Sequence, residues 1–366
     1  MKRLETTIIY QNPMPQLCSR QAMFPCLCKC SDKKIAAVFA IGEAFESVDL
    51  TSYISFSEDD GKSWTEPVQM FDKNQFDRPF SDCCKAVKLP DGSLMAMGYA
   101  FWRDNKDLPM GNAQTGGLLD DFVFYSISQD DGKSWTKPQE IKCYWGGHVE
   151  ASAPITVLKD GTLITPITGF PDWQGKMHGE QCGRALCSND GGQTWQDLSV
   201  CMQFDKNITC YEQRLCQLES GVIVNIGWNE NVDTGERLAN HFTYSLDNGK
   251  TWTYPQSTGV FGQASSLCAL GGEKLLAIHS IRRDTQRPGI YGYIVDFSNK
   301  KWDIISKEIL WEPNTPVVKD NKMAEIFAYL KFGQPSAIKL NDDTLLMTHW
   351  YCEQGEYKIA LTTIKI

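Results

Sequence analysis

A short pattern of serine, aspartate, glycine, a hydroxyl residue and tryptophan occurs four times in this chain. Its form is Ser-x-Asp-x-Gly-x-Ser/Thr-Trp, and the copies begin at Ser57, Ser128, Ser188 and Ser245. The intervals between them are 71, 60 and 57 residues. Repeats at this period are typical of propellers and solenoids, so the pattern restricts the chain to a repeated architecture.

The residues of the pattern are those of a tight hairpin turn. Glycine adopts the positive φ of a close reversal, and the Asp and Ser side chains accept hydrogen bonds from the backbone of the turn. The tryptophan covers the neighbouring apolar layer, so we expect the four tryptophans to be buried between repeats. Because each Asp has local partners, we expect a structural and not a catalytic role for the pattern.

The four copies resemble the Asp-box, or BNR, repeat of the sialidase superfamily. Members of that superfamily are six-bladed β-propellers, and most are exo-acting glycoside hydrolases. The resemblance implies this architecture strongly and an activity only weakly, because a fold does not fix a function.

A second repeat, between the boxes, consists of an apolar strand, a turn and another apolar strand. Its six copies span residues 21–41, 82–94, 152–163, 212–224, 263–276 and 334–347. A fifth, degenerate box keeps only its Trp302. The sequence therefore predicts an all-β fold, a six-bladed β-propeller of four-stranded antiparallel blades, as a single domain over residues 1–366. We expect the strand near residues 5–10 to complete the last blade, because closing the ring removes exposed edges.

Charge and composition exclude several classes of function. The net charge is −9 with no run of basic residues, which argues against nucleic-acid binding. No apolar stretch is long enough for a membrane segment or a signal peptide, so we expect a cytoplasmic protein whose 14 cysteines are reduced. Cys26, Cys28 and Cys30 lack a second ligand pair, so we interpret them as packed thiols and expect no metal and no cofactor.

Chemistry is expected where the innermost strands of the blades begin, because these positions converge on one rim of the central channel. Aligning the six repeats brings acids and amides together there. They are Gln21, Asp82, Glu150 with Ser152, Glu212, Gln263 and Gln334. A ring of such groups is suited to a sugar.

The segment that begins at Tyr211 resembles the sialidase stretch in which a glutamate opens this strand and polarises a tyrosine nucleophile. On this resemblance Glu212 is a nucleophile or the activator of one. Arg214 lies on the same face of the strand, so it can hold Glu212 or a ligand. The alternative is a rim salt bridge with no catalytic role.

Two further acids are candidates for the proton donor. Glu150 follows Trp145 and His148, in a loop whose aromatic and polar groups suit a pyranose. Asp49 lies in the connection where the resemblance implies the general-acid aspartate, with Glu46 as the second choice. For each acid the alternative is a solvated loop carboxylate.

The arginines depart from the pattern of the superfamily. Sialidases bind the substrate carboxylate with three arginines, yet Met23 stands where the first is expected, and Gln334 replaces the nucleophilic tyrosine. Arg78, Arg282 and Arg283 are available near the rim, and a guanidinium can hold a carboxylate with two hydrogen bonds. The alternative for each is a surface or inter-blade ion pair.

These observations favour an exo-acting glycoside hydrolase that releases a terminal sugar, which can be acidic, from a small oligosaccharide. The expected catalytic residues are Glu212, Glu150 and Asp49. The expected substrate-binding residues are Arg214, Arg282, Arg283, Arg78, Asp82, Gln263, Gln334, Trp145 and His148. Two alternatives stay open: a true sialidase with a displaced arginine and tyrosine, and a non-catalytic propeller that binds carbohydrate or a partner.

Overall fold

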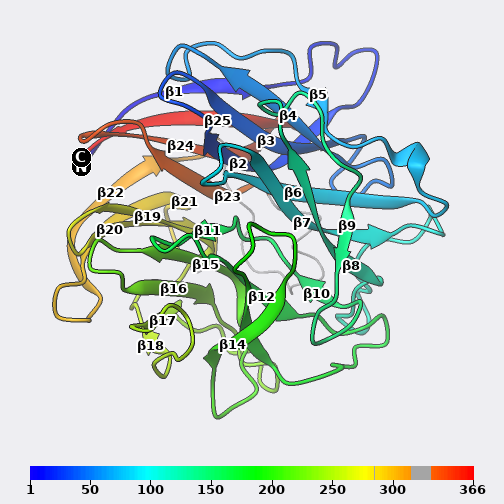
Figure 1. The fold of residues 1–366 in the computed structure, drawn as a ribbon. Helices are drawn as coiled ribbons and strands as arrows, with labels where there is room; N and C mark the ends of the chain where they lie inside the picture. The colour runs from blue at the N-terminus through cyan, green and yellow to red at the C-terminus, as the bar shows by residue number, and fades with distance from the viewer. Residues whose placement is uncertain (284, 315–330) are drawn as a thin grey trace.

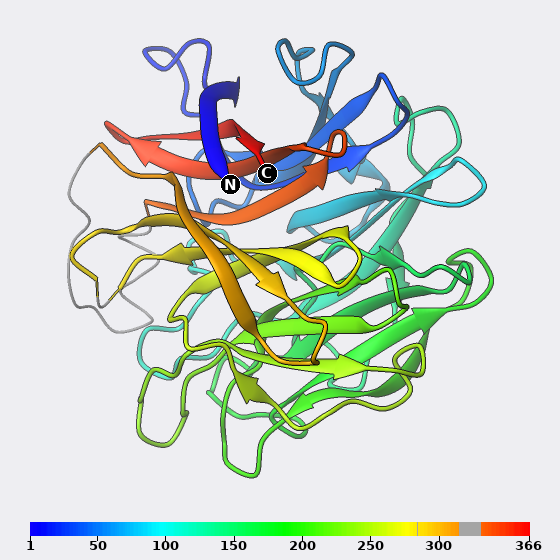
Figure 2. The ribbon, with the colours of Figure 1, turned by 90° about the vertical axis from the view of Figure 1, so that its left-hand side faces the viewer.

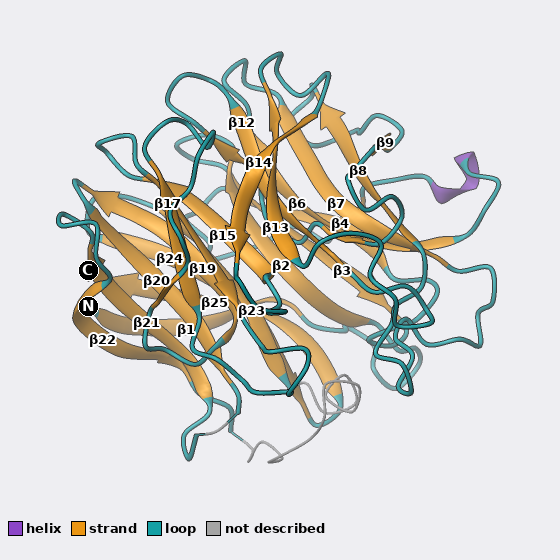
Figure 3. Ribbon diagram, turned by 90° about the horizontal axis from the view of Figure 1, so that it is seen from below, coloured by secondary structure: helices purple, strands orange, loops and turns teal. Residues whose placement is uncertain are grey.

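The computed structural model describes residues 1–283, 285–314 and 331–366. These residues form six antiparallel sheets that follow one another around a ring, as the order of colours in Figure 1 shows. The predicted all-β, six-bladed propeller is confirmed. Strands dominate the structure, with one short helical segment among the described residues (Figure 3). No helix in the described ranges combines the length and apolarity needed to cross a membrane.

In the first, second, fourth and fifth blades the innermost strand comes first in the chain, and each following strand pairs with the one before it. The first blade contains β2 (Gln21–Lys29), β3 (Ile35–Gly42), β4 (Thr51–Ser57) and β5 (Val68–Gln69). After the 3₁₀ segment η1 (Lys73–Gln75), the second contains β6 (Phe80–Lys88), β7 (Leu94–Trp102), β8 (Asp121–Ser128) and β9 (Gln139–Ile141).

The third blade has an interrupted inner strand, made of β10 (Val149–Glu150) and β11 (Thr156–Val157), which both pair with β12 (Leu163–Gly169). β13 (Cys182–Ser188) and β14 (Gln196–Gln203) complete it. The fourth contains β15 (Tyr211–Gln217), β16 (Ile223–Trp228), β17 (His241–Ser245) and β18 (Gln256–Ser257). The fifth contains β19 (Gln263–Gly271), β20 (Lys274–Ile281), β21 (Gly289–Asp296) and β22 (Asp303–Trp311).

The sixth blade closes the ring with both ends of the chain. It contains β23 (Phe332–Lys339), β24 (Thr344–Glu353), β25 (Glu356–Lys365) and, outermost, β1 (Lys2–Tyr10). β1 pairs antiparallel with β25, with Ile8 opposite Ala360, and the two termini lie close together (Figure 2). The predicted closure by the N-terminal strand is confirmed.

The apolar core is divided among the six interfaces between blades. Each blade is apolar on both faces because it packs against two neighbours, so its middle strands read as continuous apolar runs. β3, for example, is buried at every position. One buried cluster joins Phe39 of the first blade to Leu346 and Leu361 of the last, and the other five lie at the remaining interfaces. The ring is therefore held by side chains all the way round.

The Asp-boxes have the hydrogen bonds that the sequence predicts. In the first box, Asp59 accepts bonds from the backbone N–H and the hydroxyl of Ser63, and the Ser57 hydroxyl accepts from the Gly61 N–H. The same bonds occur in the other three boxes. Gly61 has a φ of +87°, and a Cβ there would lie 2.6 Å from Leu361 of the preceding blade. The structural role of the boxes is confirmed.

The box tryptophans are less buried than expected. Trp64 and Trp135 are only partly buried, as are the other two, although each packs against an inter-blade cluster. The reason is that the indole N–H turns back to the carbonyl of the box glycine, which keeps one edge of the ring at the surface. Trp302, from the degenerate box, packs against the cluster between the fourth and fifth blades, but within the described ranges its indole N–H has no hydrogen-bond partner.

The cysteines are free thiols, and Cys26, Cys28 and Cys30 are buried on or directly after β2. Within the described ranges, His, Cys, Asp and Glu side chains form no group of three arranged to hold a metal ion.

Candidate functional site

A cavity of about 560 Å³ lies where the inner strands begin, and all six blades contribute to its wall. Five of the predicted rim residues line it: Asp82, Glu150, Glu212, Gln263 and Gln334. Gln21 does not line it, because its side chain bonds to the backbone N–H of Tyr357 and to Ser19. The convergence expected from the repeat is therefore found for five of the six inner strands.

The inner strands carry β-bulges at this rim. The regular pairing shifts at the start of β2, β15, β19 and β23. At each shift a residue other than glycine has a positive φ: Phe24 (57°), Glu212 (45°), Ala264 (52°) and Gln334 (44°). Positive φ costs an L-residue about 1 kcal/mol or more, and such strain and bulges gather at functional sites, where they redirect side chains. Here they mark the rim of the cavity.

Glu212 has hydrogen-bond partners in the third, fourth and sixth blades. Its Oε2 accepts a hydrogen bond from Trp228 Nε1 at 2.8 Å, and its Oε1 accepts from Gln334 Nε2 at 2.7 Å. Its own backbone N–H donates to Glu150 Oε2 at 2.7 Å. Gln334 thus stands beside Glu212 in the position where the resemblance to sialidases leads us to expect a tyrosine.

Glu150 is almost fully buried beside Glu212. It accepts hydrogen bonds from the backbone N–H groups of Ser152 and Glu212. Burial raises its pKa above the usual range, the Arg214 charge opposes that rise, and the Glu212 charge adds to it. The direction is that of a carboxyl group which keeps its proton to a higher pH than a solvated glutamate.

Arg282 and Arg283 both line the cavity. Arg282 donates from Nε to Gln263 Oε1 at 3.2 Å and from Nη1 to the Phe332 carbonyl at 3.1 Å. Burial lowers the Arg282 pKa to about 10, which the Glu212 charge partly offsets. Arg283 lies with Nη1 3.8 Å from Glu230 Oε2.

Asp82 is the acid of the second blade in this ring. Its carboxylate is 2.8 Å from Lys73 Nζ, and it accepts bonds from the Thr51 hydroxyl and the Ser52 backbone N–H. The bonds to Thr51 and Ser52 join the second blade, which carries Asp82, to the first.

Asp49 is not at the cavity. Its two oxygens accept hydrogen bonds from the Glu43 backbone N–H and so brace the loop that follows β3. Glu46, the second choice from the sequence, lines the cavity instead. It accepts a hydrogen bond from the Met110 N–H, and burial raises its pKa. Of these two acids only Glu46 lines the cavity, because in a loop with three acids only the folded backbone decides which one faces inward.

Four more predicted binding residues lie outside the cavity wall. Arg214 is buried, and its guanidinium donates to Ser152 Oγ and the Gln213 carbonyl. Trp145 is buried beneath Gly169 and Gly179. Both side chains are therefore buried in contacts within or between blades and are not accessible to a ligand in the cavity.

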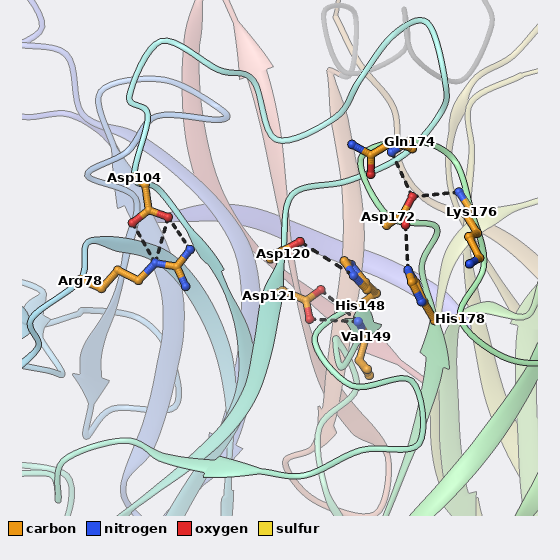
Figure 4. A network of polar contacts seen from close by, with 10 residues as sticks. All are labelled: Arg78, Asp104, Asp120, Asp121, His148, Val149, Asp172, Gln174, Lys176 and His178. Carbon is orange, nitrogen blue, oxygen red and sulfur yellow. Dashed lines mark hydrogen bonds and ion pairs between the residues drawn. The ribbon is translucent and has the colours of Figure 1, made fainter.

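The other two, Arg78 and His148, belong to a polar network on loops of the second and third blades (Figure 4). Arg78 forms a two-point ion pair with Asp104 over the ring of Trp102. The His148 ring stacks on His178, which is 2.7 Å from Asp172. These contacts connect loops to one another, and neither Arg78 nor His148 lines the cavity where the sequence led us to expect them.

The sequence analysis missed much of the wall. Tyr99, Tyr211 and Trp228 line the cavity beside Glu150 and Glu212, and Tyr211 was adjacent to a residue already singled out. A hairpin loop over residues 109–118 supplies another side. It is fixed to the loop after β12 by bonds from Leu118 to the Pro171 carbonyl and from Asn112 to the Trp173 carbonyl. The glycines of this loop indicate a turn, but no other feature of its sequence predicts that it lines the cavity.

Fold and site together define a sialidase-like β-propeller with a carboxylate-lined channel mouth. The family model of the BNR repeat-like domain matches residues 109–303, more than half of the chain, and the protein belongs to this family. The fold is that of the sialidase superfamily.

Solved structures with the same fold include proteins with and without a known activity. A protein of unknown function from Dyadobacter fermentans is 19% identical with a TM-score of 0.77, and the match covers 100% of this chain and 99% of the other. The Hadza microbial sialidase Hz136 is 17% identical with a TM-score of 0.68 over 94% of this chain and 66% of the other. The Trypanosoma rangeli sialidase in complex with the inhibitor DANA is 16% identical with a TM-score of 0.65 over 94% of this chain and 55% of the other. This chain thus spans about half to two thirds of these two sialidase chains.

Proposed function

We propose that this protein is an exo-acting glycoside hydrolase in which Glu150 is the general acid and Glu212 the nucleophile or catalytic base. The observation that carries the proposal is the hydrogen bond to Glu150 from the strained backbone of Glu212, two residues that both line the cavity. Two carboxyl groups with different environments are what glycoside hydrolysis requires.

The environments of the two acids support different roles. Burial raises the pKa of Glu150, which favours a group that holds a proton for the leaving oxygen. Glu212 is oriented by Trp228 and Gln334, so its carboxylate is fixed for attack or for activating water. A tyrosine nucleophile is not favoured, because burial raises the pKa of both Tyr99 and Tyr211 and nearby acids raise it further.

The walls support an exo mode of action. The loop over residues 109–118 is joined to the loop after β12, and together they close one side of the cavity. A volume of about 560 Å³ lies within the range of small-molecule sites. The walls carry aromatic rings on which the apolar face of a sugar can stack.

The test is an assay of purified protein on a panel of aryl glycosides of neutral sugars, uronic acids and sialic acid. We expect Glu212→Gln and Glu150→Gln each to lower turnover by about 10²-fold or more with little change in Tm, since acid–base and covalent roles are typically of this size. Glu140→Gln is the control, because Glu140 is exposed on the outer strand β9. Turnover by Glu212→Gln above a tenth of the wild-type rate contradicts the proposal.

A second candidate is a non-catalytic sugar-binding propeller. The observation in its favour is that both oxygens of Glu212 and both of Glu150 already have protein donors. Measurable sugar binding with no turnover of any substrate in the panel supports this alternative.

A further inference from the structure

The charged groups at the cavity bear on which kind of sugar it accepts, and this step rests on the proposed function of the cavity as a sugar site. Of the described residues that line the cavity, six have a carboxyl or a guanidinium group. Four are acids and two are arginines: Glu46, Asp82, Glu150, Glu212, Arg282 and Arg283. The wall therefore has no excess of cations to attract a carboxylate.

Both arginines are committed to protein acceptors. Arg282 donates from Nε to Gln263 and from Nη1 to the Phe332 carbonyl. A guanidinium binds a carboxylate with two hydrogen bonds through either Nε and Nη2 or Nη1 and Nη2, so one donor of each pair already has a protein acceptor. A two-point clamp on a substrate carboxylate would break one of these bonds. The Arg283 guanidinium faces the Glu230 carboxylate at 3.8 Å.

The cations behind the wall also bond to protein acceptors; Arg103 keeps Nε and Nη1 without a hydrogen-bond partner among the described residues, but it is buried and does not line the cavity. Lys73 pairs with Asp82, Arg103 donates to the Glu46 and Leu108 carbonyls, and Arg214 donates to Ser152 and the Gln213 carbonyl. Lys85 donates to the carbonyls of Phe24 and Pro25. These bonds hold inner strands and loops, so they cannot be exchanged for a ligand without disturbing the site.

We propose that the terminal sugar bound in this cavity is neutral, in contrast to the acidic sugar of sialidases. An acidic sugar would lose its hydration and meet the carboxylates of Asp82 and Glu212 without gaining a new cation, which is unfavourable. A neutral pyranose needs only rings for its apolar face and dispersed donors and acceptors for its hydroxyls. The rings are those of Phe24, Phe45, Tyr99, Phe101, Phe170, Tyr211, Trp228 and Trp350.

The experiment compares matched pairs of free sugars by titration calorimetry on the whole protein. Glucose with glucuronic acid, and galactose with galacturonic acid, differ only in a hydroxymethyl or a carboxylate at one carbon, and N-acetylneuraminic acid is tested beside them. We expect the neutral sugar of at least one pair to bind about tenfold or more tighter than its acid. Equal or tighter binding of the acids in both pairs, tightest binding of N-acetylneuraminic acid, or binding of none of the sugars overturns the inference.

Arg282→Gln separates the explanations further, with Arg287→Gln as the control because Arg287 pairs with Glu312 outside the cavity. We expect Arg282→Gln to change the affinities for the neutral and acidic sugars by the same factor. A loss of tenfold or more for the acids alone contradicts the inference. Binding needs no turnover, so neutral-sugar binding without hydrolysis would refute the proposed activity and leave this inference standing.

Discussion

At the scale of single residues, the site depends on side chains that are positioned by an unfavourable backbone conformation with positive φ. Glu212 and Gln334 have positive φ at equivalent positions of the inner strands β15 and β23, and their side chains form a hydrogen bond of 2.7 Å. Such strain lowers the stability of the folded protein and is compensated by packing elsewhere in the blades, so we expect these two residues to serve function at a cost in stability.

This strain gives a first prediction on stability. Glu212→Gly should be more stable than Glu212→Ala by about 1 kcal/mol, because glycine adopts positive φ without the clash of a Cβ. Urea unfolding measures the difference. At Lys307, a position on the exposed strand β22 without positive φ, the order should be reversed, with alanine more stable than glycine. The same order at both positions would argue against strain at Glu212.

A second prediction concerns pH. If protonated Glu150 is the acid, activity falls as pH rises through its raised pKa, and the stability due to protonated Glu150 is lost in the same direction. Arg214 holds this pKa down, so Arg214→Gln should move the alkaline limb of the pH–rate profile upward, whereas Arg214→Lys should leave it in place. An unmoved limb in Arg214→Gln, with Tm showing that the variant is folded, would exclude Glu150 as the group that sets it.

At the scale of elements, the Asp-box is a turn that makes its own hydrogen bonds and covers the next interface. Asp59, Asp130 and Asp190 each accept three hydrogen bonds within the box, which lower the pKa of each to about 2. The glycine of each box meets the side chains of the preceding blade. The same eight residues thus form the hydrogen bonds of the turn and pack one blade against the preceding one.

The boxes predict how the fold responds to acid. Their pKa values are lowered on folding, so the stability they give is present above pH about 4 and is lost as pH falls toward 2. Replacing all three aspartates by asparagine should lower Tm at neutral pH and flatten its fall between pH 4 and 2. Asp60→Asn and Asp131→Asn, at the neighbouring exposed positions, serve as the control. A triple variant as acid-sensitive as the wild type would contradict this role.

At the scale of the whole molecule, the ring is closed by a strand from each end of the chain. β1 pairs with β25, and Ile9 and Tyr10 also enter the apolar cluster between the last and first blades. The rim needs this closure, because Gln334 and Trp350 of the sixth blade face the acids and aromatics of the others.

Removal of residues 1–10 should therefore lower Tm by more than about 5 °C and promote association, since it exposes the edge of β25 and uncovers apolar side chains. Thermal unfolding and light scattering after gel filtration measure both effects. Leu4→Ala, an exposed position on β1, should change neither. A monomeric truncated protein of unchanged Tm would show that β1 is dispensable for closure.

The sequence by itself determined the architecture, the number of blades, the closing strand and five residues of the rim. It did so because strand alternation, turn residues and the box recur along the chain, and a ring of equal blades brings equivalent positions together. Glu150, Glu212 and Gln334 could be placed at the rim from the repeat alone.

Only the tertiary structure decided which side chains face the cavity. The sequence does not distinguish Asp49 from Glu46, or Arg214 from Arg282. In the structure Glu46 and Arg282 line the cavity, whereas Asp49 bonds to the backbone of its own loop and Arg214 bonds to Ser152 of the neighbouring blade. The loop over residues 109–118 lies outside the strand–turn–strand repeat, and Tyr99 and Trp350 lie beyond the ends of the aligned copies at 82–94 and 334–347. Orientation at the rim depends on bulges and on inter-blade contacts, which are set by residues far apart in sequence, so a local pattern cannot encode it.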